Sequence, residues 1–213
     1  MAKRILVLVW AIVASLSVGV TESLAGQGYP AEMKKLQARG GGPQVGDVAP
    51  DFRIKGLDGK TEIQLSTLKG RLVVLFFGSY SCPIFRGGID PIKELHAKYT
   101  KTVEFVMVYV DEAHPIGGIP AVENDRENLH LKLATTWEEK AGHAKLCVTA
   151  KGMQIPTVVD ELDNSVQTAY AAWPTRMYLV GRDGRVVYRG PASVVDAIRP
   201  AEVEAAITSQ LKK

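Results

Sequence analysis

Cysteine is the residue type in this 213-residue chain best suited to redox chemistry, and the chain has two, Cys82 and Cys147. Two are too few for a disulfide-stapled scaffold and do not give the spacing of metal ligands. Cys82 follows an apolar run over residues 71–77 and precedes Pro83, which suits the first position of a helix. Unpaired N–H groups and the helix dipole would stabilise a thiolate there. We therefore predict that Cys82 is a redox-active nucleophile with a lowered pKa, the alternative being a small buried residue.

An oxidised Cys82 needs a second thiol to return to its reduced state. Phe85 stands where a thioredoxin-type CxxC motif has its second cysteine, so no local disulfide can form. Cys147 could resolve an oxidised Cys82 if a loop brought it near, because a disulfide needs Cα atoms within about 7 Å. Alternatively, an external thiol resets Cys82, and Cys147 is a buried packing residue.

Residues 1–25 have the pattern of an export signal: basic residues precede an apolar run, and small residues allow cleavage after Ala25. The alternative is an uncleaved membrane anchor over residues 5–20, which is slightly short for a spanning helix. Export implies a periplasmic or extracellular location, where disulfides persist.

One domain is predicted to follow, over residues 45–213. Residues 26–44 contain several glycines and little apolar periodicity, which predicts a flexible lead-in. The domain opens with a β-hairpin around Asp58-Gly59. Strands are then predicted over residues 71–77, 103–110 and 157–159. Three helices are predicted between and after them: one that begins after Cys82, one over 125–140 and one over 165–172. Residues 176–180 and 186–188 form a second hairpin, and Pro200 opens a last helix.

A parallel βαβ unit followed by an antiparallel hairpin and a closing helix is the order of a thioredoxin-like fold. We predict an α/β domain of this fold, with a mixed central sheet flanked by helices and an N-terminal β-hairpin extension. In such a fold Trp173-Pro174-Thr175, just before a strand, occupies the slot of a cis-proline beside the active cysteine. A plain turn proline is the alternative for Pro174.

Composition and charge limit the other functions. The chain is 46% hydrophobic and 23% charged with a formal net charge of +3, which is ordinary for one globular domain. The charge is too small and too scattered to bind nucleic acid, so we expect no such partner. His96, His130 and His143 lack a convincing set of co-ligands, and we expect structural or surface roles for them. We expect neither a metal nor a bound cofactor.

Several segments carry a family resemblance. The start of the domain, residues 45–52 with 68–71, looks like that of redoxin and peroxiredoxin domains. A narrower resemblance, to the iodothyronine deiodinase family, is carried by FGSYSCP at 77–83, VYVDEAH at 108–114 and YAAWPTRMYL at 170–179. The likeness covers about residues 45–212.

In the deiodinase family, selenocysteine occupies the position of Cys82, so the resemblance implies that Cys82 is the reactive nucleophile. It also implies a surrounding network, whose members here are Ser79, Ser81, Tyr109, Glu112, His114 and Arg176. The second active-site histidine of the family aligns near Arg126, so that part of the network is absent or rebuilt. Glu112 and His114 could relay protons to a leaving group, the alternative for His114 being an ordinary exposed loop histidine.

The predicted function is that of a thiol-dependent oxidoreductase in which the Cys82 thiolate attacks an electrophilic atom of a small molecule. In a deiodinase-like reaction that atom is iodine on an aromatic ring, and in a peroxiredoxin-like reaction it is a peroxide oxygen. Ser79 lies where peroxiredoxins orient peroxide, but Leu75 replaces the proline that they carry. A thiol or a thioredoxin-like reductase is the expected reductant. The third alternative is a non-enzymatic exported adaptor.

Overall fold

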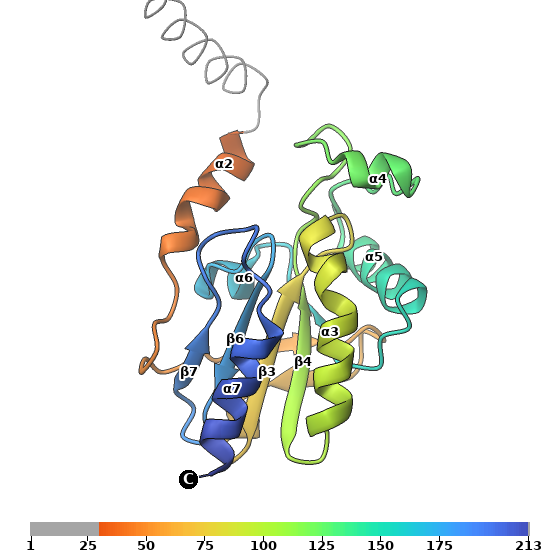
Figure 1. Cartoon of the computed structure of the whole chain (residues 1–213). Helices are drawn as coiled ribbons and strands as arrows, with labels where there is room; N and C mark the ends of the chain where they lie inside the picture. Colours follow the sequence, from red (N-terminus) through yellow and green to blue (C-terminus); the bar gives the residue numbers. More distant parts are fainter. Residues whose placement is uncertain (1–29, 213) are drawn as a thin grey trace, which may run out of the picture.

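The computed structural model describes residues 30–212, and a five-stranded mixed sheet lies at its centre (Figure 1). The strands are β3 (Leu72–Gly78), β4 (Val103–Tyr109), β5 (Thr157–Val159), β6 (Arg176–Val180) and β7 (Val186–Arg189). Their order is β5-β4-β3-β6-β7, with β3, β4 and β5 parallel and β6 and β7 antiparallel to their neighbours. A separate antiparallel hairpin pairs β1 (Arg53–Lys55) with β2 (Glu62–Gln64). The predicted thioredoxin-like arrangement and its N-terminal hairpin are confirmed.

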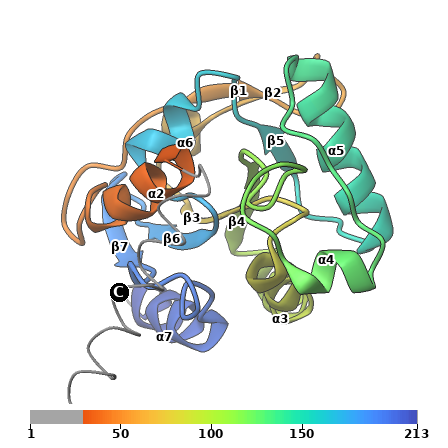
Figure 2. The same cartoon turned by 90° about the horizontal axis from the view of Figure 1, so that it is seen from above.

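Helices cover both faces of the sheet. They are α2 (Pro30–Gln37), α3 (Pro83–Tyr99), α4 (Val122–Arg126), α5 (Trp137–Ala150), α6 (Ser165–Ala169) and α7 (Pro200–Leu211), with 3-10 turns η1 (Ala38–Gly40) and η2 (Leu65–Leu68). In the two views, α3 and α7 lie on one face, α6 and the β1–β2 hairpin lie on the other, and α5 lies beside β5 (Figures 1 and 2).

The sheet brings the predicted site residues to one edge. β3 is apolar and buried along its whole length, as expected for a strand covered on both faces. It runs parallel to β4 in a register that pairs Gly78 with Tyr109, the last residues of the two strands. The segments 79–82 and 110–114 therefore leave the sheet side by side at its carboxyl edge, where ligand sites of parallel sheets lie.

α3 begins as predicted and packs tightly against β3. Cys82 is its N-cap, in extended backbone, and Pro83 is its first residue. Phe85 is completely buried, and its ring stacks on that of Phe76 with centroids 4.8 Å apart. A Cβ on Gly78 would lie 1.9 Å from the Phe85 ring, so this end of β3 requires a glycine.

The helix predicted over residues 125–140 is wrong in its bounds. The chain instead forms α4, an irregular stretch and then α5. Asn128 has a φ of 50°, in the left-handed region, just after the end of α4. Thr136 caps α5, because its side chain accepts a hydrogen bond from the Glu139 N–H at 3.2 Å. The apolar spacing that predicted one helix runs across this break.

The segment predicted to be a flexible lead-in is ordered where the structure describes it, because residues 30–40 form α2 and η1. Arg39 is 3% exposed and donates hydrogen bonds to carbonyls far along the chain, which anchors a segment that has few apolar residues. The export signal or anchor predicted over residues 1–25 lies outside the described residues. Within residues 30–212, no helix is both long and apolar enough to cross a membrane.

Candidate active site

Cys82 lies at the start of α3 as predicted, but its side chain is only 1% exposed. Burial raises the pKa of the Cys82 thiol to about 11. The N–H groups of Phe85 and Ile84 and the charge of Arg86 act in the opposite direction but are outweighed. The predicted lowering of the Cys82 pKa is therefore wrong for this arrangement, because removing a thiolate from water costs more free energy than the helix terminus returns.

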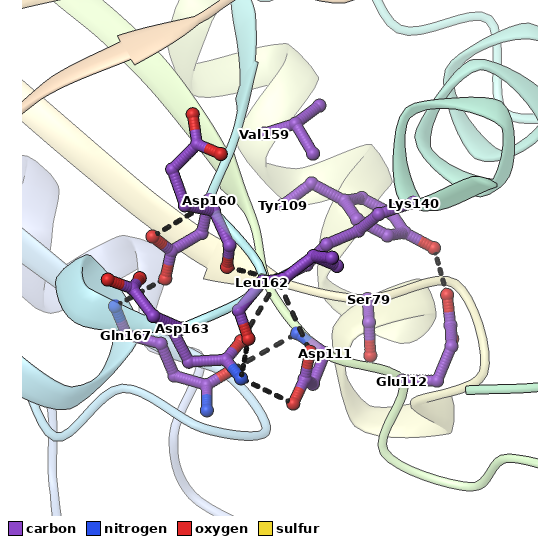
Figure 3. Close-up of polar contacts among 12 residues, drawn as sticks. Ser79, Tyr109, Asp111, Glu112, Lys140, Val159, Asp160, Leu162, Asp163 and Gln167 are labelled. Carbon is purple, nitrogen blue, oxygen red and sulfur yellow. Dashed lines mark hydrogen bonds and ion pairs between the residues drawn. The ribbon is translucent and has the colours of Figure 1, made fainter. Parts of the chain in front are cut away.

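Glu112 is the centre of a hydrogen-bonded chain beside the Cys82 turn. Its carboxylate accepts hydrogen bonds from the Ser81 N–H at 2.8 Å and from the Tyr109 hydroxyl. The Tyr109 oxygen in turn accepts one from the Tyr80 N–H at 3.0 Å. Figure 3 shows Tyr109 and Glu112 facing each other at the end of β4. Two predicted site residues thus meet, and both hold the turn that leads to Cys82.

Burial also controls the protons of this pair. It raises the pKa of Glu112, while hydrogen bonds from Ser81 and Tyr109 lower that pKa in part. Burial and the neighbouring Glu112 charge raise the pKa of Tyr109 well above its usual value. A carboxyl group with a raised pKa keeps its proton at a higher pH than an exposed glutamate does, which is the property required of a general acid.

The two predicted serines fasten the turn before α3 to the loop after β4. Ser79 Oγ accepts a hydrogen bond from the Ala113 N–H at 3.1 Å, and Ser81 Oγ accepts one from the His114 N–H at 3.0 Å. The His114 ring is half-buried, and its Nδ1 lies 2.9 Å from the Ile119 carbonyl oxygen. Nδ1 therefore carries the donated proton, and Nε2 is the acceptor when the ring is neutral.

His143 on α5 lies beside this chain, and the surface or structural role predicted for it stays a prediction. Its Nδ1 lies 3.6 Å from Glu112 Oε1, and its positive charge lowers the Glu112 pKa. The His143 side chain is 20% exposed against 2% for Glu112. Its Nδ1 is buried and has no hydrogen-bond partner among residues 30–212, so its contact with Glu112 is electrostatic. Lys140, Ala144 and Cys147 form the buried face beside it. Their helical spacing would have revealed His143 had α5 been placed correctly.

The residue of α4 that contacts the Cys82 turn is Asn124, and not Arg126 as predicted. Arg126 is exposed in the last turn of that helix and does not join the described network. Asn124 is 4% exposed and donates from Nδ2 to the Ser81 carbonyl at 2.9 Å. His130 is exposed beyond the helix, 3.9 Å from Asp125. A buried amide, which the sequence pattern did not single out, therefore connects α4 to the Cys82 turn.

The peptide bond between Trp173 and Pro174 is cis, which confirms the predicted cis-proline over the plain turn proline. Thr175 connects this turn to the end of β3, because its Oγ1 donates a hydrogen bond to the Phe77 carbonyl at 2.7 Å. Arg176 is completely buried and donates to backbone carbonyls, among them that of Ala171 at 3.0 Å. It therefore braces the Pro174 turn and lies apart from the Glu112 chain.

Cys147 lies on α5 and not on a loop. It is completely buried, and both cysteines are free thiols. Burial raises the pKa of Cys147 to about 12, and the Glu112 charge acts in the same direction. A resolving role for Cys147 thus requires a helix or the Cys82 turn to move, and it stays a prediction.

A second polar cluster lies on the other side of the β4 end. Asp111 forms ion pairs with Lys140 at 3.2 Å and with Lys35 at 2.7 Å. It also accepts a hydrogen bond from Asn164 at 2.9 Å, and its N–H donates to Gln167 at 3.1 Å. Figure 3 shows Asp111 on the side of Gln167 and Glu112 on the side of Tyr109. The cluster holds α2, α5 and the α6 region on the strand end.

Across residues 30–212, no three His, Cys, Asp or Glu side chains are grouped as a metal site would require.

Comparison with protein families supplies the deciding observation. The family model described as "Iodothyronine deiodinase" matches residues 33–208. The chain belongs to the iodothyronine deiodinase family. It is 30% identical over 147 residues to the type I iodothyronine deiodinase of Xenopus laevis, and 32% identical over 151 residues to the thyroxine 5-deiodinase of Sparus aurata. These matches cover 68% of this chain but 56% and 54% of the relatives, so this deiodinase-family chain spans about half the length of the curated relatives it matches.

Solved structures agree on the fold of this deiodinase-family domain. A putative protein disulfide isomerase from Bacteroides thetaiotaomicron has a TM-score of 0.58 and 22% identity, with 80% of this chain and 92% of that one covered. A putative thiol:disulfide interchange protein DsbE from Chlorobium tepidum has a TM-score of 0.57 and 22% identity, with 79% and 99% covered. The likeness establishes a thioredoxin-like fold.

Proposed function

We propose that this deiodinase-family chain is a thiol-dependent oxidoreductase whose nucleophile is Cys82, in the position of the selenocysteine. The observation that carries the proposal is the hydrogen-bonded chain that starts at the Cys82 turn and runs through Glu112 and Tyr109, with His143 between Glu112 and the surface. Such an arrangement holds a buried carboxyl group with a raised pKa beside the turn that carries the thiol, and reductive removal of a halogen requires a nearby proton donor.

The proposed reaction begins with attack of the Cys82 thiolate on the iodine of an aryl iodide. An S–I bond forms, the C–I bond breaks, and its electron pair stays on the ring carbon, which takes a proton. An external thiolate then attacks the Cys82 sulfur, iodide leaves, and a mixed disulfide forms. A second external thiolate releases Cys82. The aryl iodide gains two electrons, and two thiols become one disulfide.

The proton for the ring carbon comes from the Glu112 chain in this proposal. Burial raises the Glu112 pKa, which favours the protonated carboxyl group, and the partly exposed His143 lies 3.6 Å from it. His114 is the second proposed donor, acting through Nε2 when both ring nitrogens carry a proton, because Ser81 holds its backbone beside the Cys82 turn. Since Cys82 is 1% exposed, substrate must open the site to reach the thiol.

The test compares turnover of an iodinated phenol and of hydrogen peroxide, each with dithiothreitol as reductant. We expect iodide release from the wild-type protein and none from Cys82→Ser, because a hydroxyl is a far weaker nucleophile than a thiolate. Cys147→Ser is the matched control, and it keeps turnover if the external thiol resets Cys82 directly. Full activity of Cys82→Ser would contradict the proposal.

The same assay separates the other candidates. In a thiol peroxidase, Cys82 attacks a peroxide oxygen, the O–O bond breaks, and a sulfenic acid and an alcohol or water form. Peroxide consumption without iodide release would assign that reaction. Absence of both reactions, with a Cys82 thiol that alkylates as slowly as its raised pKa implies, would assign an adaptor role.

Location and reductant are part of the proposal. We propose export to the periplasm or the cell exterior, with residues 5–20 as a membrane anchor if the leader stays uncleaved. The reductant would be a small thiol or a thioredoxin-like reductase, because each turnover passes two electrons to the substrate and Phe85 leaves Cys82 without a local partner thiol.

A further inference from the structure

Arg39 in η1 is a buried cation that the proposed chemistry does not use. Its side chain reaches the Pro174 turn, and the residue is 3% exposed. Nη1 donates to the Trp173 carbonyl at 2.6 Å and to the Thr175 carbonyl at 3.0 Å. These two carbonyls stand on either side of Pro174, so one nitrogen atom brackets the turn.

The other nitrogens of Arg39 bind a third segment of the chain. Nε donates to the Ala192 carbonyl at 2.6 Å, and Nη2 donates to the carbonyls of Pro191 at 3.2 Å and Ser193 at 3.5 Å. The Arg39 carbonyl accepts a hydrogen bond from Arg176 at 2.9 Å. Arg39 thus joins the N-terminal segment, the Pro174 turn and the stretch after β7.

This guanidinium group has carbonyl partners and, in residues 30–212, no ion pair with a carboxylate. Burial and the neighbouring Arg176 lower its pKa to about 10, so it stays charged at neutral pH. The charge of a Cys82 thiolate would act in the opposite direction on that pKa. Burying a cation without a counter-charge costs folding free energy. Here the buried guanidinium group fixes the geometry of the Pro174 turn through its hydrogen bonds.

The backbone around Arg39 also packs directly on the same loop. Gly42 has a φ of +81°, and a Cβ on it would lie 2.7 Å from the Tyr170 carbonyl oxygen. Because Tyr170 leads into the Pro174 turn, the segment 38–42 contacts this loop through backbone as well as through the Arg39 side chain.

We propose that Arg39 is a positioning residue for the Pro174 turn, which makes the N-terminal segment 38–42 a working part of the redox site. Arg39 holds the carbonyls of Trp173 and Thr175 in place, so that the turn presents a fixed surface to a molecule bound at Cys82. The inference rests on the proposed function only for what that molecule is.

The test uses the full chain with Arg39→Met and Arg39→Lys, and with Lys34→Met as control. Lys34 is an exposed cation on α2, close in sequence to Arg39. One readout is kcat and KM with whichever substrate the wild-type protein turns over. The other is amide hydrogen exchange over residues 170–178, with β4 as the internal reference.

Arg39→Met is expected to lower kcat/KM on the order of tenfold to a hundredfold, mostly through a higher KM, because substrate meets a displaced turn. Exchange should become faster over 170–178 and stay unchanged over β4. Arg39→Lys should fall between Arg39→Met and wild type, since an ammonium keeps the charge but not the planar fork. Lys34→Met should match wild type in both readouts.

Two results would overturn the inference. One is faster exchange in β4 and the turn alike with unchanged kinetics, which means that Arg39 only stabilises the fold. The other is that Arg39→Lys has the same amide exchange rates and the same kinetics as the wild-type protein. Arg39→Lys alone decides the question if Arg39→Met does not fold. If the wild-type protein turns over neither substrate, the proposed function fails separately, and the exchange comparison alone decides on Arg39.

Discussion

A negative charge on Glu112 disfavours a negative charge on Cys82, because the two residues are close. The Glu112 carboxylate accepts a hydrogen bond from the N–H of Ser81, which immediately precedes Cys82. Both side chains are buried, and the Glu112 charge raises the Cys82 pKa beyond the effect of burial. Forming the thiolate is therefore easier when the carboxyl group keeps its proton. In the proposed reaction this arrangement would link activation of Cys82 to protonation of Glu112, which is the pairing that a reductive protonation needs.

The first prediction follows from the raised pKa of the thiol. In a Cys147→Ser background, the rate of Cys82 alkylation by iodoacetamide should rise about tenfold per pH unit from pH 7 to pH 10, because only the thiolate reacts. The pKa of about 11 places the plateau above this range. Stopped-flow or mass-spectrometric alkylation rates measure it, and a plateau below pH 9 would contradict the burial of the thiol.

The second prediction concerns His143. Its positive charge lowers the Glu112 pKa, so His143→Gln should raise that pKa and move the alkaline loss of turnover to higher pH. The pH profile of kcat/KM measures the shift. His130→Gln is the matched control, because His130 is exposed beyond α4. Equal profiles for the two variants would remove His143 from the proton chain.

Among the elements, α5 shows where sequence patterns succeed and where they fail. The strands were predictable because they are continuous apolar runs that the fold buries on both faces, as in β3. α5 was missed because apolar spacing across Asn128 outweighed a local cap signal, Thr136 followed three residues later by Glu139. That misplacement hid His143, whereas Glu112 and Tyr109 were found because they follow a correctly placed strand.

The third prediction tests this cap. Thr136→Ala should lower the free energy of unfolding by about 1 kcal/mol, because the Glu139 N–H loses its acceptor at the start of α5. Denaturant unfolding measures the change. Thr149→Ala, at an exposed position later in the same helix, is the control and should be neutral or slightly stabilising. Equal losses in both variants would show that the cap contributes nothing.

For the whole molecule, long-range polar contacts are what the sequence could not reveal. The thioredoxin-like fold and the meeting of loops at its carboxyl edge follow from the order of the elements. The ordered N-terminal segment does not, because one arginine anchors it to carbonyls more than 130 positions away in the chain. A sequence pattern carries no signal for a side chain that binds backbone alone.

The fourth prediction is alkaline destabilisation of the whole fold. Burial raises the pKa of Cys82 to about 11 and of Cys147 to about 12, from an ordinary value of 9.0. Their stabilising contribution is complete below pH 9 and is lost as the pH rises toward these values, because the unfolded chain releases the protons first. The free energy of unfolding should fall between pH 9 and pH 11, and it should fall less in Cys147→Ala. An equal fall in both proteins would show that other groups, such as the buried tyrosines, cause it.

The contact between Gly78 and Phe85 also limits how this chain could change over evolutionary time. Phe85 fills the position of a second redox cysteine, and its ring occupies the space that a Cβ on Gly78 would need. A single exchange of Phe85 for cysteine would leave an empty volume against β3, with the free-energy cost of a cavity. A paired change, with a larger residue at position 78 filling the space that the ring leaves, would avoid that cost on the way to a dithiol within this motif.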